Sequence, residues 1–330
     1  MPEALERALA GDRSAFDELV DPHRAELLLH CYRLLGSYAD AEDALQETLL
    51  AAWLALAGFE GRSSLRTWLY RIATTRSLNL RRSTRRAAHR QARAVGAAAP
   101  LPGAPPPTAT GEVVWLQPFP DAALDRVAEP VPGPEARYEQ KEAVSLAFVR
   151  MLQLLPPRQR AVVVLRDVLG YPAADAADLL GVSVDAANGA LKRARATLAD
   201  EALPEPDVAE GSRTLDRLVD SFLAGRVDDV VELLTDDAWL RMPPLPAEYR
   251  GREAAREFLH ATAGHRHGLV ALVPVGCNRQ PAWGEYVLDA VEGHRHLIGV
   301  LVADLRGSRV AALTHFDTAV GALLGLPRTL

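Results

Sequence analysis

The chain has 330 residues, of which 48% are hydrophobic and 24% charged, and its formal net charge is −6 at pH 7. This length predicts two or three domains, and the composition is typical of globular protein rather than of a disordered or fibrous chain. No apolar run approaches the roughly 18 residues of a membrane span, and the N-terminus lacks a signal-peptide pattern, so we expect a cytoplasmic protein with no membrane partner.

Cysteine usage and charge distribution narrow the function. The two cysteines, Cys31 and Cys277, match neither a disulfide framework nor a metal-ligand spacing, so we expect no metal and no cofactor. No acidic residue lies between Glu60 and Glu112, whereas arginines crowd the first part of that stretch and acidic residues are frequent before it. This asymmetry indicates two partners, one rich in phosphate and one a basic or mixed protein surface.

Residues 1–86 are predicted to form a small helical domain. Apolar residues recur at helical spacing up to Leu34, and again after Asp40, which stands where an N-cap is expected. A third helix is predicted to start at Ser63 or Ser64 and to continue into the arginine-rich segment.

Residues 87–134 are predicted to be a linker of limited order. Proline, alanine and glycine dominate it, and proline at this density removes backbone donors and blocks helix formation. The segment from Trp115 to Pro120 (WLQPFP) is too aromatic for an inert spacer, so we expect it to dock on a surface.

Residues 135–202 return to a helical pattern that includes a helix-turn-helix. Pro172 opens a short helix, Gly181 suits a left-handed C-cap, and Ser183 can cap the next helix, which runs to about Ala199. In this motif the second helix enters the major groove of DNA. A two-helix packing motif that binds no DNA is the alternative.

Polar residues of that second helix are the predicted contacts with DNA. They are Ser183, Asp185, Asn188, Lys192, Arg193 and Arg195. Asn188 is the best base reader among them, and the three cations suit phosphates. In the first domain, Trp68 and Tyr70 stand among arginines, as a single-strand binder requires, because a base can stack while its phosphate is neutralised. A solvated helix face is the alternative for the arginines.

Three sequence segments together carry a resemblance to a known family. They are DAEDALQETLLAAW at 40–53, FEGRSSLRTWLYRIATTRSLNLRR at 59–82, and LQLLPPRQRAVVVLRDVLG with the helix-turn-helix at 152–199. In order and spacing they resemble the two domains of extracytoplasmic-function (ECF) sigma factors, over most of residues 1–200. The resemblance implies two all-α domains that bind core RNA polymerase and promoter DNA.

The resemblance also implies roles for particular residues. The helix that binds the clamp of the polymerase β′ subunit would present Asp40, Glu42, Asp43, Gln46 and Glu47. Recognition and opening of the minus-ten element would fall to Phe59, Arg62, Ser63, Arg66, Trp68, Arg71, Asn79, Arg81 and Arg82. The helix-turn-helix would read the minus-thirty-five element, and the β flap of polymerase is a further implied partner. Family members often carry a polar or basic residue at the position of Gly189.

Residues 212–330, after a short linker at 203–211, have an α+β pattern. Helices are predicted around Leu218 and Phe258, and strands at 268–275, 282–290, 295–305 and 309–317. With DDAWLRMPPLPAEYRGREAAREFL at 236–259 and ALTHFD at 311–316, this part resembles the cone-shaped SnoaL-like fold. With the WLQPFP segment, the whole chain resembles the SigG-type subfamily, which carries such a domain.

The SnoaL-like fold encloses a pocket, so acid and base groups in this domain are candidates for chemistry or for a small ligand. Trp239, His315 and Asp317 are the predicted pocket residues, and the last two would share one face of a strand. Further candidates are Asp236, Asp237, His260, His294 and His296. Such residues at strand ends are more often structural, so we expect a regulatory domain rather than an enzyme.

Two other functions are weighed against a sigma factor. A one-component DNA-binding regulator would act outside the polymerase holoenzyme and would need no acidic clamp-binding helix. A small-molecule enzyme fused to a DNA-binding region would show turnover that depends on Asp317. Neither the promoter sequence nor the activating signal follows from the residues.

Overall fold

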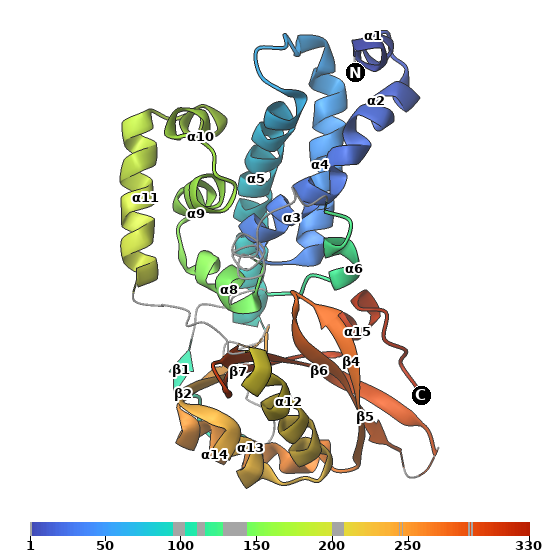
Figure 1. The fold of residues 1–330 in the computed structure, drawn as a ribbon, viewed down its shortest axis with the longest axis vertical. Helices are drawn as coiled ribbons and strands as arrows, with labels where there is room; N and C mark the ends of the chain where they lie inside the picture. The colour runs from blue at the N-terminus through green and yellow to red at the C-terminus, as the bar shows by residue number, and fades with distance from the viewer. Residues whose placement is uncertain are drawn as a thin grey trace. The chain divides into compact units, whose positions relative to one another are not determined.

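The computed structural model describes residues 2–94, 103–110, 116–127, 144–199, 208–243, 245, 247–289, 291 and 293–330. Side chains at 2, 81–94, 110, 199 and 208–210 are outside this description. The chain forms two compact units, one of Met1–Ala87 with Ala122–Ala202 and the other of Ala88–Asp121 with Leu203–Leu330. The first is the helical unit and the second the C-terminal unit (Figure 1). Within the described ranges, no helix has the length and apolar character needed to cross a membrane.

Five helices make up the first part of the helical unit. They are α1 (Pro2–Leu9), α2 (Arg13–Val20), α3 (Arg24–Leu35), α4 (Tyr38–Ala55) and α5 (Leu65–Ala94). The predicted N-cap at Asp40 is wrong, because α4 begins earlier: Ser37 is its N-cap, and the Ser37 hydroxyl accepts a hydrogen bond from the Asp40 amide at 3.2 Å. Ser64 caps α5 by accepting from the Thr67 amide at 3.1 Å, and the helix begins at Leu65, next to the predicted start. This helix continues past residue 86, the expected end of the domain.

The helices that follow along the chain include the two of the predicted helix-turn-helix. They are α6 (Asp121–Leu124), α8 (Leu146–Leu154), α9 (Pro157–Val163), α10 (Ala173–Leu180) and α11 (Val184–Ala199). Gly181 ends α10 with a φ of 62°, and the Ser183 hydroxyl accepts from the Ala186 amide at 3.2 Å, so both predicted caps are confirmed. Ala187 and Leu191 of α11 are buried in a core shared with α9.

The C-terminal unit is a seven-stranded sheet with the helices of residues 208–262 on one face, and it has the expected α+β class. Its strands are β1 (Ala109–Thr110), β2 (Leu234–Arg241), β3 (Ala247–Arg250), β4 (Leu269–Cys277), β5 (Gln280–Leu288), β6 (Arg295–Arg306) and β7 (Arg309–Phe316). Their order is β1-β3-β2-β7-β6-β5-β4, and all neighbours are antiparallel except β2 and β7, which are parallel.

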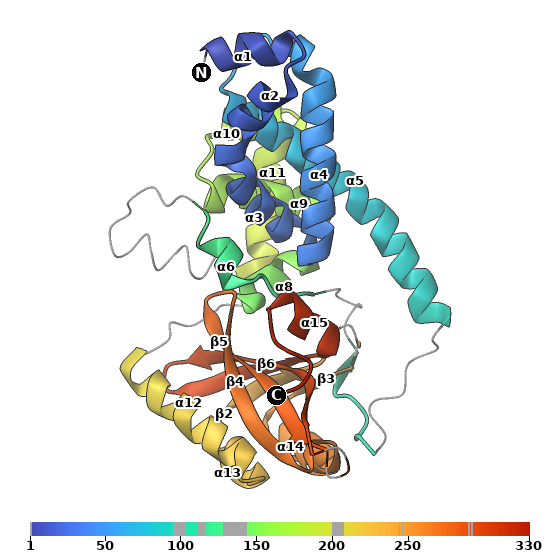
Figure 2. The same ribbon diagram turned by 90° about the vertical axis from the view of Figure 1, so that its right-hand side faces the viewer.

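Four helices accompany this sheet: α12 (Val208–Leu223), α13 (Val227–Leu233), α14 (Arg252–Thr262) and α15 (Thr318–Leu323). Leu218 and Phe222 of α12, with Phe258 of α14, share one core with Trp283 and Leu301 of the sheet. In Figure 2 the helices α12 to α14 lie along one side of the strands. The four predicted strands are confirmed near their expected bounds, whereas β1, β2 and β3 were not predicted.

The expected linker contributes to the C-terminal unit at both edges of its sheet. At one edge β1 pairs with β3, and the Thr108 hydroxyl accepts from the Arg250 amide at 2.6 Å. At the other, Pro120 bridges to Cys277 at the end of β4. Docking of the aromatic segment is therefore confirmed for Leu116–Pro120, and Trp115 lies outside the described residues.

Candidate nucleic-acid interface

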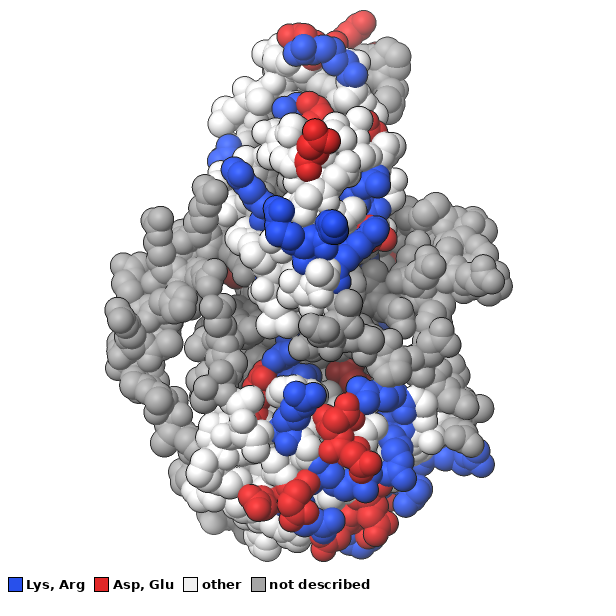
Figure 3. Space-filling view, turned by 90° about the vertical axis from the view of Figure 1, so that its left-hand side faces the viewer, with Lys and Arg blue, Asp and Glu red and all other residues white. Residues whose placement is uncertain are grey.

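The second helix of the helix-turn-helix presents a polar and basic outer face. Its buried side is lined by alanine and leucine, with Ala194 fully buried and Leu198 partly buried. The predicted contacts Ser183, Asp185, Asn188, Lys192, Arg193 and Arg195 are all exposed. Figure 3 shows basic side chains gathered across this side of the helical unit. Such a face can neutralise phosphates and present an amide to base edges.

Arg195 and Arg193 are oriented by neighbours. Arg195 forms a two-pronged ion pair with Asp167, with Nη2–Oδ1 at 2.6 Å and Nε–Oδ2 at 3.1 Å. That hydrogen bonding raises the pKa of Arg195. An Arg193 guanidinium nitrogen lies 3.5 Å from the position that a Cβ at Gly189 would occupy. Arg193 therefore covers the helix surface where Gly189 offers no side chain.

The outer face of α4 is acidic and then apolar. Glu42, Asp43, Gln46 and Glu47 are exposed and Asp40 is half-buried, while the opposite side of α4 is buried. Burial, together with the charge of Asp43, raises the pKa of Asp40 above its usual value. We call these five residues the acidic face.

Leu50 and Leu54 extend the acidic face by two helical turns. Their exposed fractions are 54% and 74%, which is unusual for leucine in a well-packed helix. Sequence reasoning named neither leucine, although both lie outside the predicted apolar stripe of this helix. An acidic surface that borders exposed leucines is suited to docking on a protein with basic and apolar groups.

The predicted minus-ten residues fall into a stacked aromatic pair and a set of arginines. Phe59 and Trp68 have ring centroids 5.1 Å apart with an interplanar angle of 48°. Both are half-buried, so an aromatic surface reaches solvent next to exposed Arg62 and Ser63. Arg62 pairs with Glu60 at 2.9 Å at the surface, and such exposed pairs exchange readily for phosphate contacts.

Arg66 is held inside its own domain. Its Nη2 and Nε lie 2.6 and 2.9 Å from Glu26 Oε2, and its guanidinium lies 4.8 Å from the centre of the Tyr70 ring. Burial opposes ionisation of Glu26, but the hydrogen bonds from Arg66 and His23 prevail and lower its pKa. Arg66 is thus positioned to orient Tyr70 and the start of α5, and its side chain stays 44% exposed.

The remaining predicted minus-ten residues lie farther along α5. Arg71 is exposed and makes a 3.5 Å ion pair with Asp178 of α10. Asn79 is exposed and faces a pocket. The side chains of Arg81 and Arg82 lie outside the described ones, and the helix itself continues through both.

The three predicted pocket residues of the C-terminal unit are not brought together. Asp317 lies beyond β7 and caps α15, accepting from the Ala319 amide at 3.0 Å. Trp239 is flanked by Arg241 and Arg250, whose guanidinium carbons lie 4.7 and 5.1 Å from its ring. The neighbouring Leu240 is paired in register with Leu313 in the core, and side chains alternate along strands, so Trp239 is on the face opposite His315.

His315 instead joins a buried cluster that the sequence did not reveal. Its Nε2 lies 3.0 Å from Glu285 Oε2, while Arg266 Nε donates to Glu285 Oε1 at 3.0 Å. Burial would raise the pKa of Glu285, but the charge of Arg266 and the hydrogen bond from His315 lower it to about 2. Gly299 lies between Glu285 and His315, where any Cβ would collide with the imidazole. The cluster is an ionised carboxylate held between an arginine and a histidine.

The other acid and base candidates of this unit make surface ion pairs or face solvent. Asp236 pairs with Arg252 at 2.9 Å, Asp237 with Arg306 at 2.9 Å, His260 with Asp228 at 3.2 Å and His296 with Asp289 at 3.8 Å, while His294 is exposed. No group of three or more His, Cys, Asp or Glu side chains among the described residues is arranged to hold a metal ion.

The linker segment before α6 is clamped onto the turn between β4 and β5. The fully buried Asn278 accepts from the Phe119 amide through Oδ1 at 2.7 Å, and its own amide donates to the Phe119 carbonyl at 2.9 Å. Asn278 adopts a left-handed φ of 54°, which turns both groups toward the segment. Asp121 adds a bond from the Arg279 amide at 2.8 Å. We call these contacts the linker clamp.

The helical unit combines a helix-turn-helix that has a basic outer face with helix α5, whose sequence contains many arginines and no acidic residue. This combination defines a transcription protein of the sigma-70 type. The family model for Sigma-70 region 2 matches residues 19–87, and that for Sigma-70 region 4 matches residues 145–198. The ECF RNA polymerase sigma factor SigG of Mycobacterium tuberculosis is 40% identical, over 96% of this chain and 85% of the relative.

More distant relatives agree. The ECF RNA polymerase sigma factor SigM of M. tuberculosis is 33% identical over 60% of this chain and 82% of the relative. The crystal structure of M. tuberculosis SigJ has a similar fold, with a TM-score of 0.62 at 22% identity, over 94% of this chain and 99% of that one. The chain belongs to the ECF RNA polymerase sigma factors, with regions 2 and 4 followed by an α+β domain.

Proposed function

We propose that the acidic face of α4 binds the β′ clamp of core RNA polymerase and that Leu50 and Leu54 extend this contact. The proposal rests on the exposure of the charged residues, on the two leucines beside them, and on the family resemblance. Region 4 would add the β flap. Since these partners work in the bacterial cytoplasm, the protein would act there.

Charge reversal tests the clamp contact. D43K/E47K should abolish co-purification with core polymerase, because two charges four residues apart on the acidic face change sign. D216K/D220K is the matched control, since Asp216 and Asp220 have the same spacing on the exposed side of α12. Retained binding by D43K/E47K, or equal loss in both variants, would favour a regulator that acts outside the holoenzyme.

The promoter contacts follow from the two basic surfaces. The Phe59–Trp68 pair, with Arg62, Ser63, Arg71, Asn79, Arg81 and Arg82, would capture the minus-ten element, while Arg66 would position this surface from within. The outer face of α11 would read the minus-thirty-five element through Asn188, with its cations on phosphates. Asn188→Ala should weaken binding by about 1–3 kcal/mol in a sequence-dependent way, whereas Lys192→Ala should weaken it for all sequences. Equal effects of both variants on cognate and scrambled DNA would contradict base reading by Asn188.

The C-terminal domain is regulatory in this proposal, rather than an enzyme. The linker clamp is the observation that carries it, because the chain joining region 2 to region 4 is bound by this domain. The domain can thus alter promoter opening without chemistry, and Asp317, the acid expected for turnover, caps a helix. Run-off transcription with core polymerase, comparing the full chain with a 1–204 truncation, tests this role. Identical transcription by both would contradict it.

A further inference from the structure

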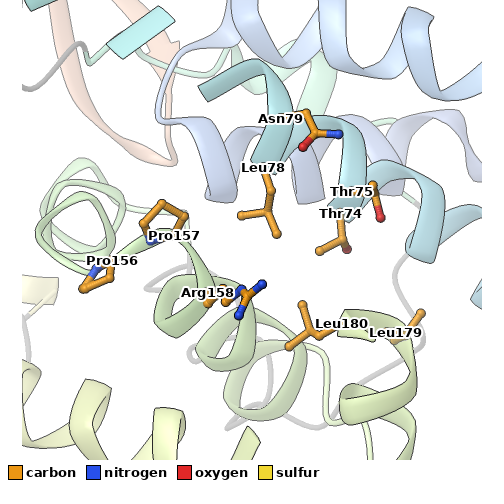
Figure 4. Close-up of a pocket in the computed structure, with 9 residues that line it drawn as sticks. All are labelled: Thr74, Thr75, Leu78, Asn79, Pro156, Pro157, Arg158, Leu179 and Leu180. Atoms are coloured by element: carbon orange, nitrogen blue, oxygen red, sulfur yellow. The ribbon is translucent and has the colours of Figure 1, made fainter. Parts of the chain in front are cut away.

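A pocket lies inside the helical unit, between α5 of region 2 and helices of region 4. Its volume is about 380 Å³, which is within the size range of small-molecule sites. It is lined by Thr74, Thr75, Leu78, Asn79, Pro156, Pro157, Arg158, Leu179 and Leu180. In Figure 4, Leu78 and Thr74 of α5 point toward Arg158 and Leu180 across the cavity.

A buried arginine links the two regions that form this pocket. Arg160 of α9 is fully buried, and its Nη1 donates to the Leu34 carbonyl at the end of α3 at 2.6 Å. Its Nη2 donates to the Leu155 carbonyl at 3.3 Å. Leu34 shares a core with Leu152 and Leu191, against which Leu78 packs. The pocket therefore lies at the junction where regions 2 and 4 pack against each other. It exists only while the two regions are in contact.

The lining selects a particular kind of ligand. Leucines and prolines make most of the wall, and the threonine hydroxyls at 74 and 75 already donate to helix carbonyls at 2.7 and 2.9 Å. Arg158 supplies a positive charge, and it makes no ion pair within the described ranges. Apolar walls with one cationic group suit a small molecule that has an apolar body and one acidic end.

We propose that this pocket binds a small aliphatic carboxylate, with the apolar chain against Leu78, Leu179 and Leu180 and the carboxylate at Arg158. Arg71 and Asn79, which the proposed function assigns to the minus-ten element, border the same junction. A ligand that binds only the closed arrangement must stabilise it, so bound carboxylate would oppose promoter capture. This second statement rests on the proposed function, whereas binding itself does not.

Binding is tested on the full-length protein without polymerase, by ligand-observed NMR and titration calorimetry. Octanoate is the probe. Octanol, which has the same chain without the charge, is the comparison compound. Octanoate should bind at least about tenfold more tightly than octanol, as expected for one charge-assisted hydrogen bond. Failure of octanoate to bind, or equal binding of octanol, overturns the proposal.

Two variants locate the site. Arg158→Gln should weaken octanoate binding about tenfold and leave octanol unchanged, and Thr75→Phe should block both by filling the cavity from an exposed helix position. Arg217→Gln, at an exposed arginine of α12, is the matched control and should bind as wild type. Unchanged octanoate binding in both pocket variants overturns the proposal. Because these readouts omit DNA and polymerase, they remain informative if the assigned promoter contacts fail.

Discussion

At the residue scale, polar side chains of the helical unit that are buried away from solvent must find hydrogen-bond partners inside the protein. His30 is fully buried, and its Nε2 lies 2.8 Å from the Thr74 hydroxyl. That hydroxyl donates to the Tyr70 carbonyl, so it accepts from His30, which fixes the neutral imidazole with its proton on Nε2. Burial, with the nearby charges of Arg33 and Arg66, lowers the pKa of His30 to about 3.

Acid should therefore destabilise the helical unit through His30. The pKa of His30 in the folded protein lies below its ordinary value. The stability that the buried neutral imidazole permits is therefore complete above about pH 6.5 and is lost as the pH falls toward 3. Between pH 7 and pH 5 the unfolded state gains a proton that the native state excludes, which costs about 2 kcal/mol. Urea unfolding at both pH values should show this loss in the wild type and a smaller one in His30→Gln, whose amide can still donate to Thr74.

His260→Gln is the control for this titration. His260 is exposed by 51% on the C-terminal unit, so its removal should leave the pH dependence of the helical unit unchanged. If His30→Gln lost as much stability between pH 7 and pH 5 as the wild type does, another group would be responsible for the acid sensitivity.

Single residues also mark where sequence reasoning reached its limit. Caps such as Gly181, Ser183 and Ser64 were predictable because their signal is local. The partners of the acidic and basic side chains in the C-terminal unit were not predictable, because strand register determines which side chains meet. Asp317 became a cap, and Glu285, which the sequence shows only as one acid in an apolar strand, became the centre of the cluster with His315.

At the element scale, the longer helices were predicted, whereas the short helices α13 and α15 and the minor strands were missed. The 3.6-residue apolar period is complete within each helix, so no knowledge of the fold was required. Strand β2 carries two exposed aspartates after Thr235, which breaks the apolar pattern, and β1 is only two residues long. Their strand state comes from pairing with β3 and β7, which sequence periodicity does not report.

The recognition helix α11 should become more stable when Gly189 is replaced by alanine. Gly189 is in the helix interior, and among the described residues the neighbour near an added Cβ is the flexible end of Arg193 at 3.5 Å. Gly189→Ala should raise the free energy of unfolding of the helical unit by about 1 kcal/mol, measured by urea denaturation.

Gly181→Ala is the comparison variant for that prediction, because the same replacement should lower stability at this position. No atom of the described residues lies within 4 Å of a Cβ added at Gly181, but the φ of Gly181 is left-handed at 62°. Alanine is therefore strained there and should destabilise the same unit. A stability loss in Gly189→Ala, or a gain in Gly181→Ala, would contradict this account of the motif.

At the scale of the whole molecule, parts of the chain between regions 2 and 4 are bound by the C-terminal unit. A flexible linker would let the two readers find promoter elements at variable spacing. Here residues 105–110 and 116–121 contribute to the C-terminal unit at both edges of its sheet, through Tyr249 at Pro105 and Asn278 at Phe119. The length of chain that can adjust is thereby reduced.

Weakening the linker clamp should therefore broaden the spacing that the protein accepts. Asn278→Gly suits the left-handed backbone but removes the Oδ1 acceptor of the Phe119 amide, a loss of about 1 kcal/mol or about fivefold in the clamped population. Run-off transcription from promoters whose two elements are moved apart or together by single base pairs should fall less steeply for the variant. Asp317→Ala, which removes the cap of α15 at similar cost without touching the clamp, is the control. Identical spacing profiles for Asn278→Gly and the wild type would mean that the linker leaves the C-terminal domain when polymerase binds, so that the clamp acts only on the unbound factor.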